Sequence, residues 1–320
     1  MEDLYKLLKF KAPEPPYSGS IIKVKIGALK DEGGTRSKVI TIGGEKNFPF
    51  FSIEEEIKPA LALQILDEPI NIPKQILTEV GEAINDPIEW AKICVNKFKS
   101  ELLAIKLIST HPVFGVKSKV KFKETLERII KVIDVPLIIC APGSDEKDAE
   151  VLEEAAKIAK GEKCILASAT LTNNYKRIAD AARKYDHLVV AETDCDPALQ
   201  KSLNEHLLDS DLPANQIIID PTSAALGLGI EYSISIIEQL KQAALKGDKS
   251  LQMPIACIRA PICSWSAREA WIEDSRFGSA EDRGILWETV TALSLFIAGA
   301  NLLVLMNPKA LIELKKLFKS

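Results

Sequence analysis

From about residue 60 onward, the chain alternates short apolar runs with longer amphipathic stretches. The apolar runs are rich in Ile, Leu, Val and Ala, and few polar residues interrupt them, which is typical of strands buried on both faces. The pattern predicts eight such strands, at 60–67, 102–109, 135–142, 164–170, 187–193, 216–220, 254–260 and 301–307.

The stretches between these runs predict helices, because their apolar residues recur at spacings of three and four. They cover 73–84, 88–99, 122–133, 148–160, 174–185, 197–208, 231–246, 282–300 and 308–319. Strict strand–helix alternation favours a parallel sheet covered by helices, and eight units favour a closed (β/α)8 barrel, or TIM barrel. The alternative is a doubly wound open sheet, but no Gly-x-Gly-x-x-Gly follows the first strand to support it.

Residues 1–59 predict an N-terminal extension, and residues 60–320 predict the barrel. The extension begins with a short helix-like stretch, and its two β-like runs, "SIIKVKIGA" and "SKVITIGG", flank the polar segment "LKDEGGTR". This arrangement predicts a β-hairpin, followed by a linker with a short helix. We expect the hairpin either to plug the bottom of the barrel or to pack on its side.

Composition narrows the classes of partner. The 320 residues are 47% hydrophobic and 27% charged, with a formal net charge of -4 and no basic block. Such a chain is a poor candidate for binding nucleic acid or an anionic membrane. Its start lacks the apolar stretch of a signal peptide, and its longest apolar run is interrupted by Gly299 and Asn301. We therefore expect a cytoplasmic protein.

The six cysteines, at 94, 140, 164, 195, 257 and 263, form no Cys-x-x-Cys pair. Structural zinc and iron–sulfur clusters are usually held by clustered thiols. We therefore expect neither on this chain, and we expect most of these cysteines to be small buried hydrophobic residues.

In a TIM barrel the active site lies at the carboxyl ends of the strands. The residues there, most of them polar, are Asp67, Glu68, Ser109, Thr110, Ala141-Pro142-Gly143, Ser168, Thr170, Glu192, Thr193, Asp194, Asp220, Arg259 and Asn307. Neither a Gly-x-Ser-x-Gly nor a His-Glu-x-x-His motif is present. Lys106, inside a strand, is a candidate for a Schiff base or for a salt-bridged core lysine.

Two further segments near these ends admit two interpretations each. "TDCDP" at 193–197 offers Asp194, Cys195 and Asp196 to a metal, but it also has the form of a helix N-cap with Pro at the first helical position, which we favour. The loop 261–282 and the helix after it contain Trp265, Trp271 and Trp287. These rings suit a flat ligand or a protein interface, or else a small satellite core.

The run "IIIDPTSAALGLGIEYS", 217–233, places Asp220-Pro221 at a strand end and then two glycines. It has no Gly-Lys-[Ser/Thr], and Tyr232 stands where a third glycine is needed, so it is neither a P-loop nor a dinucleotide-binding turn. Gly227 and Gly229 permit tight chain reversal and close backbone approach. The segment is either a ligand-facing loop or a loop that only caps a helix.

This run, "SATLTNNYKRIADAARKYDHLVVAETDCDP" and "PIACIRAPICSWSAREAW", set in eight βα units, closely resemble one family. It is the small subunit of the corrinoid iron–sulfur protein, the delta subunit of the archaeal CO dehydrogenase/acetyl-CoA synthase complex. The resemblance covers essentially the whole chain. It implies a TIM barrel that pairs with a large subunit, which carries a [4Fe–4S] cluster and most of the corrinoid site.

The resemblance further implies that cobalamin lies at the interface, against the top of this barrel. The pair would receive a methyl group from methyltetrahydrofolate through a separate methyltransferase and pass it to acetyl-CoA synthase. We expect no catalytic residue and no metal ligand on this chain. The residues expected to contact the cofactor or the partner are Ser168, Asn173, Asn174, Thr193, Asp220, Thr222, Ser223, Gly227, Arg259 and Trp265.

Two other functions remain open. More remotely, the barrel resembles pterin-binding methyltransferases, because Asp220-Pro221 and the glycine loop match their pattern, although "KLIST" lacks the Asp-x-Asn found near their early strands. The chain would then be a methyltetrahydrofolate:corrinoid methyltransferase with its own pterin site. The third function is a lyase or aldolase that uses Lys106, which borohydride trapping would test.

Overall fold

We analysed a computed structural model of the chain, which describes residues 17–51, 57–114, 118–270 and 272–318. The helix-like start, residues 52–56 of the linker and Trp271 lie outside the described residues, and the described part of the linker contains a 3-10 helix, Pro49–Phe51.

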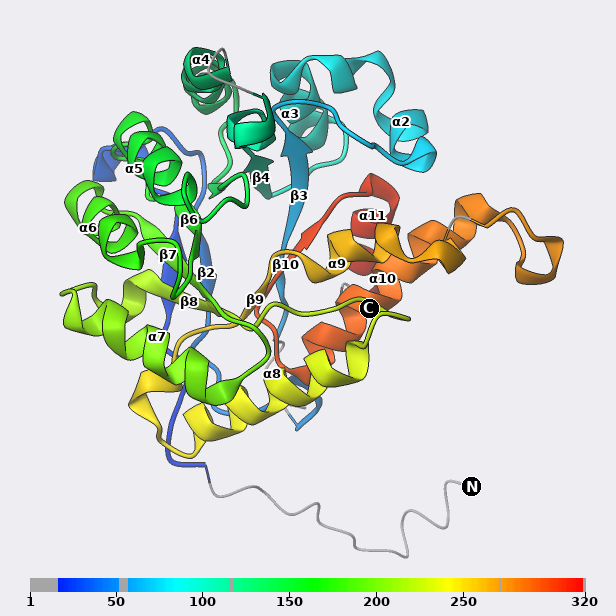
Figure 1. Ribbon diagram of the computed structural model, residues 1–320. Helices are drawn as coiled ribbons and strands as arrows, with labels where there is room; N and C mark the ends of the chain where they lie inside the picture. The colour runs from blue at the N-terminus through cyan, green and yellow to red at the C-terminus, as the bar shows by residue number, and fades with distance from the viewer. Residues whose placement is uncertain (1–16, 52–56, 115–117, 271, 319–320) are drawn as a thin grey trace, which may run out of the picture.

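Eight parallel strands form a barrel with helices around it (Figure 1). The order around the sheet is β8-β7-β6-β5-β4-β3-β10-β9, and a parallel bridge between Ile219 and Ile255 joins its two edges. The predicted (β/α)8 barrel is therefore confirmed. Its strands are β3 (Ala60–Leu66), β4 (Leu102–Lys106), β5 (Leu137–Cys140), β6 (Ile165–Ala169), β7 (Leu188–Glu192), β8 (Ile217–Asp220), β9 (Ala256–Cys257) and β10 (Leu302–Leu305).

Each predicted helix is present, and a four-residue helix, α9, was not predicted. The first predicted helix ends early and continues as the 3-10 helix Gly81–Asn85. The helices are α2 (Lys74–Val80), α3 (Pro87–Asn96), α4 (Ser118–Val132), α5 (Asp148–Ile158), α6 (Tyr175–Tyr185), α7 (Pro197–Asp209), α8 (Ile230–Leu245), α9 (Ala260–Cys263), α10 (Ala280–Ala298) and α11 (Pro308–Leu317).

Three of these helices begin at an Asp-Pro or Asn-Pro pair. The side chains of Asp86, Asp196 and Asn307 accept hydrogen bonds from backbone N–H groups two residues on, at 2.9, 2.7 and 2.8 Å. Proline suits the next position because its ring fixes φ near the helical value and its missing N–H would have no intrahelical partner there. The cap interpretation of "TDCDP" is thus confirmed for Asp196.

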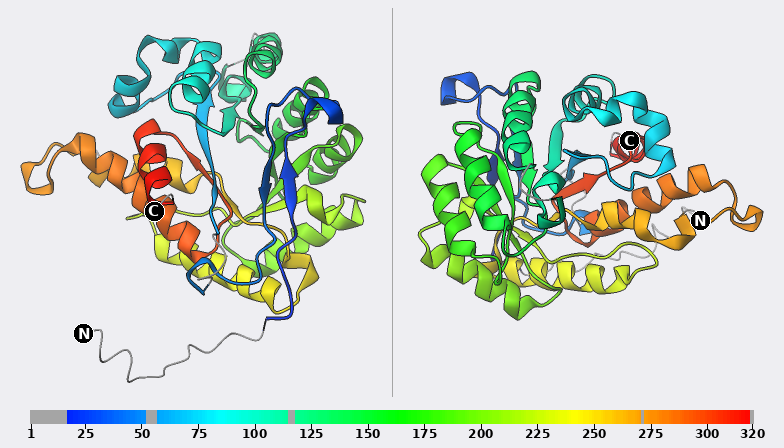
Figure 2. Two further views of the ribbon diagram at one scale, coloured as in Figure 1. Left: turned by 180° about the vertical axis from the view of Figure 1, so that it is seen from behind. Right: turned by 45° about the horizontal axis from the view of Figure 1, so that its top comes forward.

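The N-terminal hairpin closes the bottom of the barrel, where the strands begin. Strands β1 (Val24–Ile26) and β2 (Ile40–Ile42) are antiparallel, and Figure 2 shows them from behind. Val24, Ile26 and Ile42 are buried in one cluster with inward-facing residues of the barrel strands. Ile22, before β1, donates its backbone N–H to the loop that precedes β9, and Gly27, after β1, donates to the loop that precedes β6. Of the two predicted placements, the structure shows the plug.

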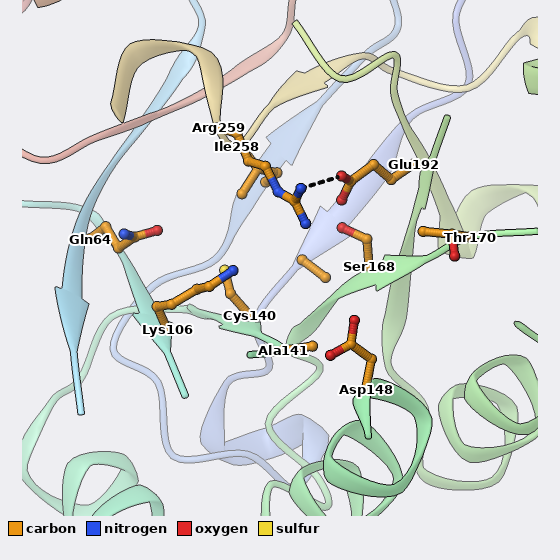
Figure 3. A pocket seen from close by; sticks show the side chains of 11 residues that line it. Gln64, Lys106, Cys140, Ala141, Asp148, Ser168, Thr170, Glu192, Ile258 and Arg259 are labelled. Atoms are coloured by element: carbon orange, nitrogen blue, oxygen red, sulfur yellow. Dashed lines mark ion pairs between the residues drawn. The ribbon is translucent and has the colours of Figure 1, made fainter. Parts of the chain in front are cut away.

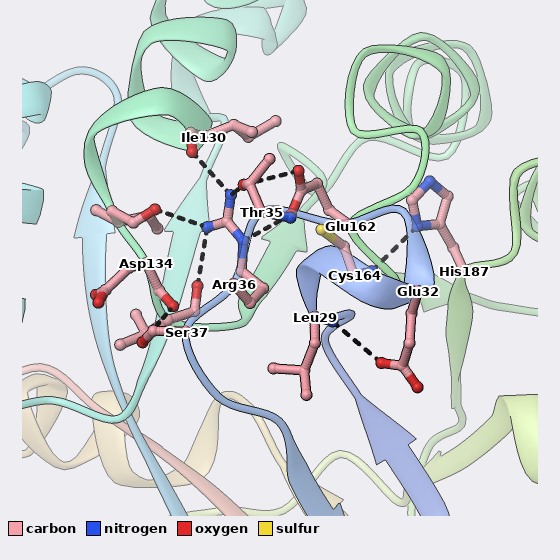
Figure 4. Close-up of polar contacts among 12 residues, drawn as sticks. Leu29, Glu32, Thr35, Arg36, Ser37, Ile130, Asp134, Glu162, Cys164 and His187 are labelled. Atoms are coloured by element: carbon pink, nitrogen blue, oxygen red, sulfur yellow. Dashed lines mark hydrogen bonds and ion pairs between the residues drawn. The ribbon is translucent and has the colours of Figure 1, made fainter.

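Arg36 ties this hairpin to the barrel (Figure 4). Its guanidinium donates to the carbonyls of Ile130, Ile133 and Val135, at 2.8 to 3.0 Å. It also pairs with the buried carboxylate of Glu162 at 2.6 Å. A buried charge is tolerated when its donors are satisfied in this way. Arg36 thus anchors the hairpin at the bottom of the barrel. The opposite end, where the strands finish, is not covered by the hairpin.

Candidate functional site

The carboxyl ends of the strands surround a cavity, which we call the central cavity (Figure 3). Its walls come from six strands or the segments after them, and two larger and more open hollows adjoin it and share Arg259. The lining residues are Gln64, Lys106, Cys140, Ala141, Asp148, Ala167, Ser168, Thr170, Glu192, Ile258 and Arg259. We call this end of the barrel the mouth.

An ion pair between Arg259 and Glu192 crosses the mouth, with 3.1 Å between Nη1 and Oε1. Thr222 also donates its hydroxyl to Glu192 Oε1, at 3.3 Å. The arginine side chain is about half exposed, whereas the glutamate side chain is 6% exposed. Glu192 Oε2 is buried and has no hydrogen-bond partner among the described residues. An unpaired carboxylate oxygen in a wall of the cavity is therefore available to a ligand that donates a hydrogen bond.

Asp220 ends β8 and lies beneath this pair, fully enclosed. Its carboxylate accepts hydrogen bonds from the backbone N–H groups of Thr222 and Ile258, both at 3.0 Å. Burial, and then the nearby charge of Glu192, raise the pKa of Asp220. Asp220 therefore holds the loops after β8 and β9 in place, and it does not line the central cavity.

Lys106 ends β4 and points into the central cavity (Figure 3). Burial lowers its pKa, and its amino group forms no ion pair or hydrogen bond with any residue of the described ranges. The expectation of a salt-bridged core lysine is therefore wrong, because no carboxylate reaches it. The neighbouring Cys140 thiol is buried, and its pKa is raised to about 11.

The loops after β5 and β6 are fixed by side chains that sit under the mouth. Asp148 accepts from the backbone N–H groups of Gly143 and Ser144, at 3.0 and 2.8 Å. Asn173 donates to the Ser168 carbonyl at 2.8 Å and accepts from the Thr170 N–H at 2.9 Å. These bonds leave the hydroxyl of Ser168 facing the cavity.

The other predicted residues of this side have varied roles. Thr193 and Thr222 line the hollow next to the central cavity, and Thr193 also donates to Gln200, at 2.8 Å. Asn174 is the N-cap of α6 and lies outside the hollows of the mouth. The buried hydroxyl of Ser223 has no hydrogen-bond partner among the described residues.

The glycine loop of 221–229 lies against α10. Gly227 has φ +78, in the left-handed region, and a side chain there would come within 3.3 Å of the Trp287 ring. Trp287 donates to the Leu226 carbonyl at 2.7 Å, and the Leu226 N–H donates to Thr291 at 3.1 Å. The glycine is thus explained locally by close approach of the chain to α10.

Trp265 is buried in the main hydrophobic core, with 4% of its surface exposed. It borders the adjoining hollow that Leu66 and Ile108 also line. Its indole N–H donates to Glu288 at 2.8 Å. Glu288 also accepts from the backbone of Met306 and Asn307, and burial raises its pKa to about 7. The sequence left open a ligand or interface role and a small satellite core, and the structure buries Trp265 in the main core instead of a satellite one.

The pair Asp67-Glu68 does not face the central cavity as two carboxylates. Asp67 is buried and accepts hydrogen bonds from the backbone and hydroxyl of Ser109. Glu68 forms an exposed ion pair with Lys121, at 3.0 Å. The residues therefore brace the loop after β4.

Of the ten predicted site residues, Ser168 and Arg259 line the central cavity, and Thr193, Thr222 and Trp265 line the adjoining hollows. The prediction named no contact role for Gln64, Cys140 or Asp148. Gln64 and Cys140 could have been found from the sequence, because each is a polar or thiol side chain near the end of an apolar strand. Asp148 had no such signal, because it belongs to a helix and reaches back to the preceding loop.

Within the described residues, no group of three or more His, Cys, Asp or Glu side chains has the arrangement of a metal site. In the same ranges, every helix is too short or too polar to cross a membrane.

The fold defines a class, the α/β barrel of eight parallel strands, and the strand ends of this chain carry charged side chains. Solved structures of dihydropteroate synthase share this fold. The enzyme of Xanthomonas albilineans with 4-aminobenzoic acid has a TM-score of 0.57 and 13% identity, covering 93% of this chain and 98% of that one. The Thermus thermophilus enzyme has a TM-score of 0.54 and 16% identity, covering 83% and 95%.

Within that class, the chain belongs to the family of the CO dehydrogenase/acetyl-CoA synthase delta subunit, whose model matches residues 23–310. It is 38% identical over 321 residues to the acetyl-CoA decarbonylase/synthase complex subunit delta of Archaeoglobus fulgidus, covering 98% of this chain and 71% of the relative. The Methanocaldococcus jannaschii subunit is 38% identical, with 98% and 77% covered. The Methanosarcina mazei subunit is 39% identical, with 94% and 70% covered.

Proposed function

We propose that this chain is the small subunit of a heterodimeric methyl carrier, and that its mouth caps a cobalamin held mainly by a large subunit. The carrier would take a methyl group from methyltetrahydrofolate through a separate methyltransferase and deliver it to acetyl-CoA synthase. The observation that supports a binding role most directly is the central cavity. It presents donors and a carboxylate oxygen of Glu192 that has no partner, and no hydroxyl or thiol among its lining residues is hydrogen-bonded to a base.

The residues of the mouth fit the chemistry of a corrinoid. Such a cofactor is a broad ring with amide groups on its rim, and bound cobalt would supply the site that carries the methyl group. Ser168, Thr170, Thr222 and Arg259 offer hydroxyl and guanidinium groups over a wide, shallow area. The [4Fe–4S] cluster would belong to the large subunit.

A surface beside the mouth fits a partner subunit. The side chains of Leu228, Tyr232, Leu286 and Val290, from the glycine loop, the start of α8 and the outer face of α10, are 42% to 71% exposed. The loop and α10 are joined by the Trp287 and Thr291 bonds described above. Apolar and aromatic side chains are enriched at the centres of protein interfaces. We refer to these four residues as the α8–α10 patch.

The test is to purify the chain alone and together with the large subunit, and to record the absorbance spectrum of the corrinoid in each preparation. We expect stoichiometric corrinoid only when both subunits are present. Tight stoichiometric corrinoid on the isolated chain would contradict binding at the interface.

The alternative function, a methyltransferase with its own pterin site, gains support from the shared fold, since dihydropteroate synthase structures with that fold include complexes with a pterine-sulfa conjugate and with 7,8-dihydropteroate. It needs a carboxylate placed against the pterin, for which Glu192 is the available group. Titration of the isolated chain with methyltetrahydrofolate discriminates between the two. Micromolar binding with methyl transfer to free cobalamin would favour the enzyme.

A further inference from the structure

The bottom of the barrel carries a hollow of its own, which we call the bottom hollow. Three segments line it: β1 with the loop after it, the segment between α5 and β6, and the end of α6 with the turn that follows. The second and third segments precede β6 and β7, so the hollow lies at the end of the barrel opposite the mouth. Its volume of about 470 Å³ is in the range of ligand pockets, and it opens to solvent.

The walls of the bottom hollow are fixed against one another by buried contacts (Figure 4). Glu162, between α5 and β6, accepts a hydrogen bond from the Thr35 hydroxyl at 2.9 Å and pairs with Arg36 at 2.6 Å, both in the hairpin. Gly161 passes so close to the hairpin that a Cβ there would lie 2.9 Å from the Gly33 carbonyl oxygen. The side chains of these two walls are therefore held on backbone segments with fixed relative positions.

Cations outnumber carboxylates in the walls of the bottom hollow. The cations are Lys25, Lys160, Lys163, Arg183 and Lys184. The carboxylates are Glu32 and Asp186, so five positive charges face two negative ones, whereas the whole chain has a formal net charge of -4. The C-terminal ends of α5 and α6 lower this excess by roughly one charge, because the dipole of each helix places about half a negative charge there. The hollow therefore remains positive on a chain that is negative on balance.

Three of the five cations already have a carboxylate partner. The pairs are Lys25 with Glu32, Lys163 with Asp186 at 3.0 Å, and Arg183 with Asp180 at 2.9 Å. In the described ranges, Lys160 and Lys184 have no carboxylate within ion-pair distance, and both side chains are exposed. The Lys184 ammonium lies over the ring of Tyr185, 5.1 Å from its centroid. These two ammonium groups are the ones that remain available to an anion from outside the chain.

The arrangement of the charges selects the kind of anion. A long polyanion would also meet the rest of a surface that is negative on balance, whereas a short acidic segment needs to match only the hollow, because interactions beyond about 10 Å are largely screened at about 0.1 M salt. Sites for a single phosphate usually converge backbone N–H groups or an arginine fork on one point. Here Lys160 and Lys184 stand on separate walls, and Arg183 is already paired. Carboxylates a few residues apart on one partner chain fit two such separated cations.

We propose that the bottom hollow is a docking surface for a short acidic segment of a partner protein. Carboxylates of the segment pair with Lys160 and Lys184, while Ala28 and the Tyr185 ring offer apolar contact to the chain between them. The inference goes beyond the proposed function, because this partner meets the end of the barrel opposite the mouth. The chain would then contact two partners at once, one at each end.

The experiment uses the full chain and hexaglutamate labelled with tetramethylrhodamine, with labelled hexaglutamine as the neutral control. Fluorescence anisotropy measures binding at about 50 mM and at about 300 mM NaCl. We expect the chain to bind hexaglutamate and not hexaglutamine. The affinity should fall by about fivefold or more at the higher salt, because contacts between exposed charges are screened.

Two double variants locate the binding. Lys160→Gln/Lys184→Gln removes the two available cations, and we expect it to weaken hexaglutamate binding by about tenfold. Lys92→Gln/Lys316→Gln is the matched control, since it also removes two exposed lysines, from α3 and α11 on the other side of the barrel, and it should bind like wild type. Circular dichroism checks that both variants are folded.

Three results would overturn the inference. The first is a wild-type chain that does not bind hexaglutamate. The second is equal affinity of the two double variants, which would show that the peptide responds to overall charge and not to the hollow. The third is tighter binding of inorganic pyrophosphate, measured by displacement of the labelled peptide, with the same dependence on Lys160 and Lys184; the hollow would then hold a small phosphorylated anion. None of these results involves the mouth, so the proposed function is tested separately.

Discussion

At the scale of single residues, the two ends of the barrel differ in how completely their buried charged groups are paired. At the bottom, Lys241 pairs with Glu45, which also accepts from Asn301 at 2.5 Å, and Arg36 pairs with Glu162. At the mouth, one oxygen of Glu192 is left without a partner. Satisfied buried charges fix a structure, and unsatisfied ones mark places where a ligand completes the pairing.

The pair of Lys241 with Glu45 gives a test of stability. Lys241→Met leaves Glu45 buried without its cation, so we expect the free energy of unfolding to fall by about 3–5 kcal/mol. Denaturant titration measures this. Lys316→Met breaks an exposed pair with Glu313 and should cost less than about 1 kcal/mol. The double variant Glu45→Gln/Lys241→Met should recover part of the loss, and a double variant no better than Lys241→Met would contradict the argument.

Glu288 gives a test by pH. Its pKa is raised to about 7 in the folded chain, against about 4.5 unfolded, so the folded state binds more protons between these values. Stability from this group is therefore present at low pH and lost as pH rises toward 7, by up to roughly 3 kcal/mol. Glu288→Gln cannot ionise, and we expect its stability relative to wild type to rise between pH 5 and pH 8. Parallel curves for the two proteins would refute the raised pKa.

At the scale of elements, the hairpin fills the bottom of the barrel, and helix caps set where three of the outer helices begin. Short apolar strands leave the barrel interior open at the bottom, and β1 and β2 fill it with Val24, Ile26 and Ile42. The Asp-Pro and Asn-Pro starts of α3, α7 and α11 set where those helices begin, and α7 and α11 follow strand ends. The loops from β7 to α7 and from β10 to α11 are therefore short, and a helix cap fixes the end of each.

The plug gives a prediction at this scale. Ile26 is completely buried in the barrel interior, so Ile26→Ala should destabilise the fold by about 2–5 kcal/mol through lost burial and a cavity. Thr41→Ala, on the exposed face of the partner strand, is the control and should change stability by about 0.5 kcal/mol or less. Thermal or denaturant unfolding measures both. Equal effects would show that the hairpin only rests on the barrel.

At the scale of the whole molecule, the glycine loop of 221–229 connects the mouth to the α8–α10 patch, because Thr222 lines a hollow of the mouth and Leu228 belongs to the patch. The patch offers apolar contact area, and the mouth offers polar groups. A partner that covered both would enclose a cofactor between the two chains. This arrangement agrees with a binding subunit whose cofactor is shared.

The patch gives the corresponding prediction. Leu286→Glu places a charge among apolar side chains, and we expect it to weaken association with the large subunit by tenfold or more. Co-purification and titration by light scattering measure the loss. Val132→Glu, an exposed apolar position at the far end of α4, should leave association unchanged. If both variants associate like wild type, the partner binds elsewhere.

The sequence by itself determined the eight strands, the nine predicted helices and the closed barrel, because continuous apolar runs and three-to-four spacing are local signals of burial. It also placed Ser168 and Arg259 at the mouth, since strand ends can be counted along the chain. It did not distinguish a free Lys106 from a paired one, or a buried Trp265 from an exposed one. Those outcomes depend on which side chains from other strands and helices come within contact distance, and only the closed tertiary structure decides that. The same reason separates Asp220, which proved to be a brace beneath the mouth, from Glu192, whose free oxygen faces the cavity.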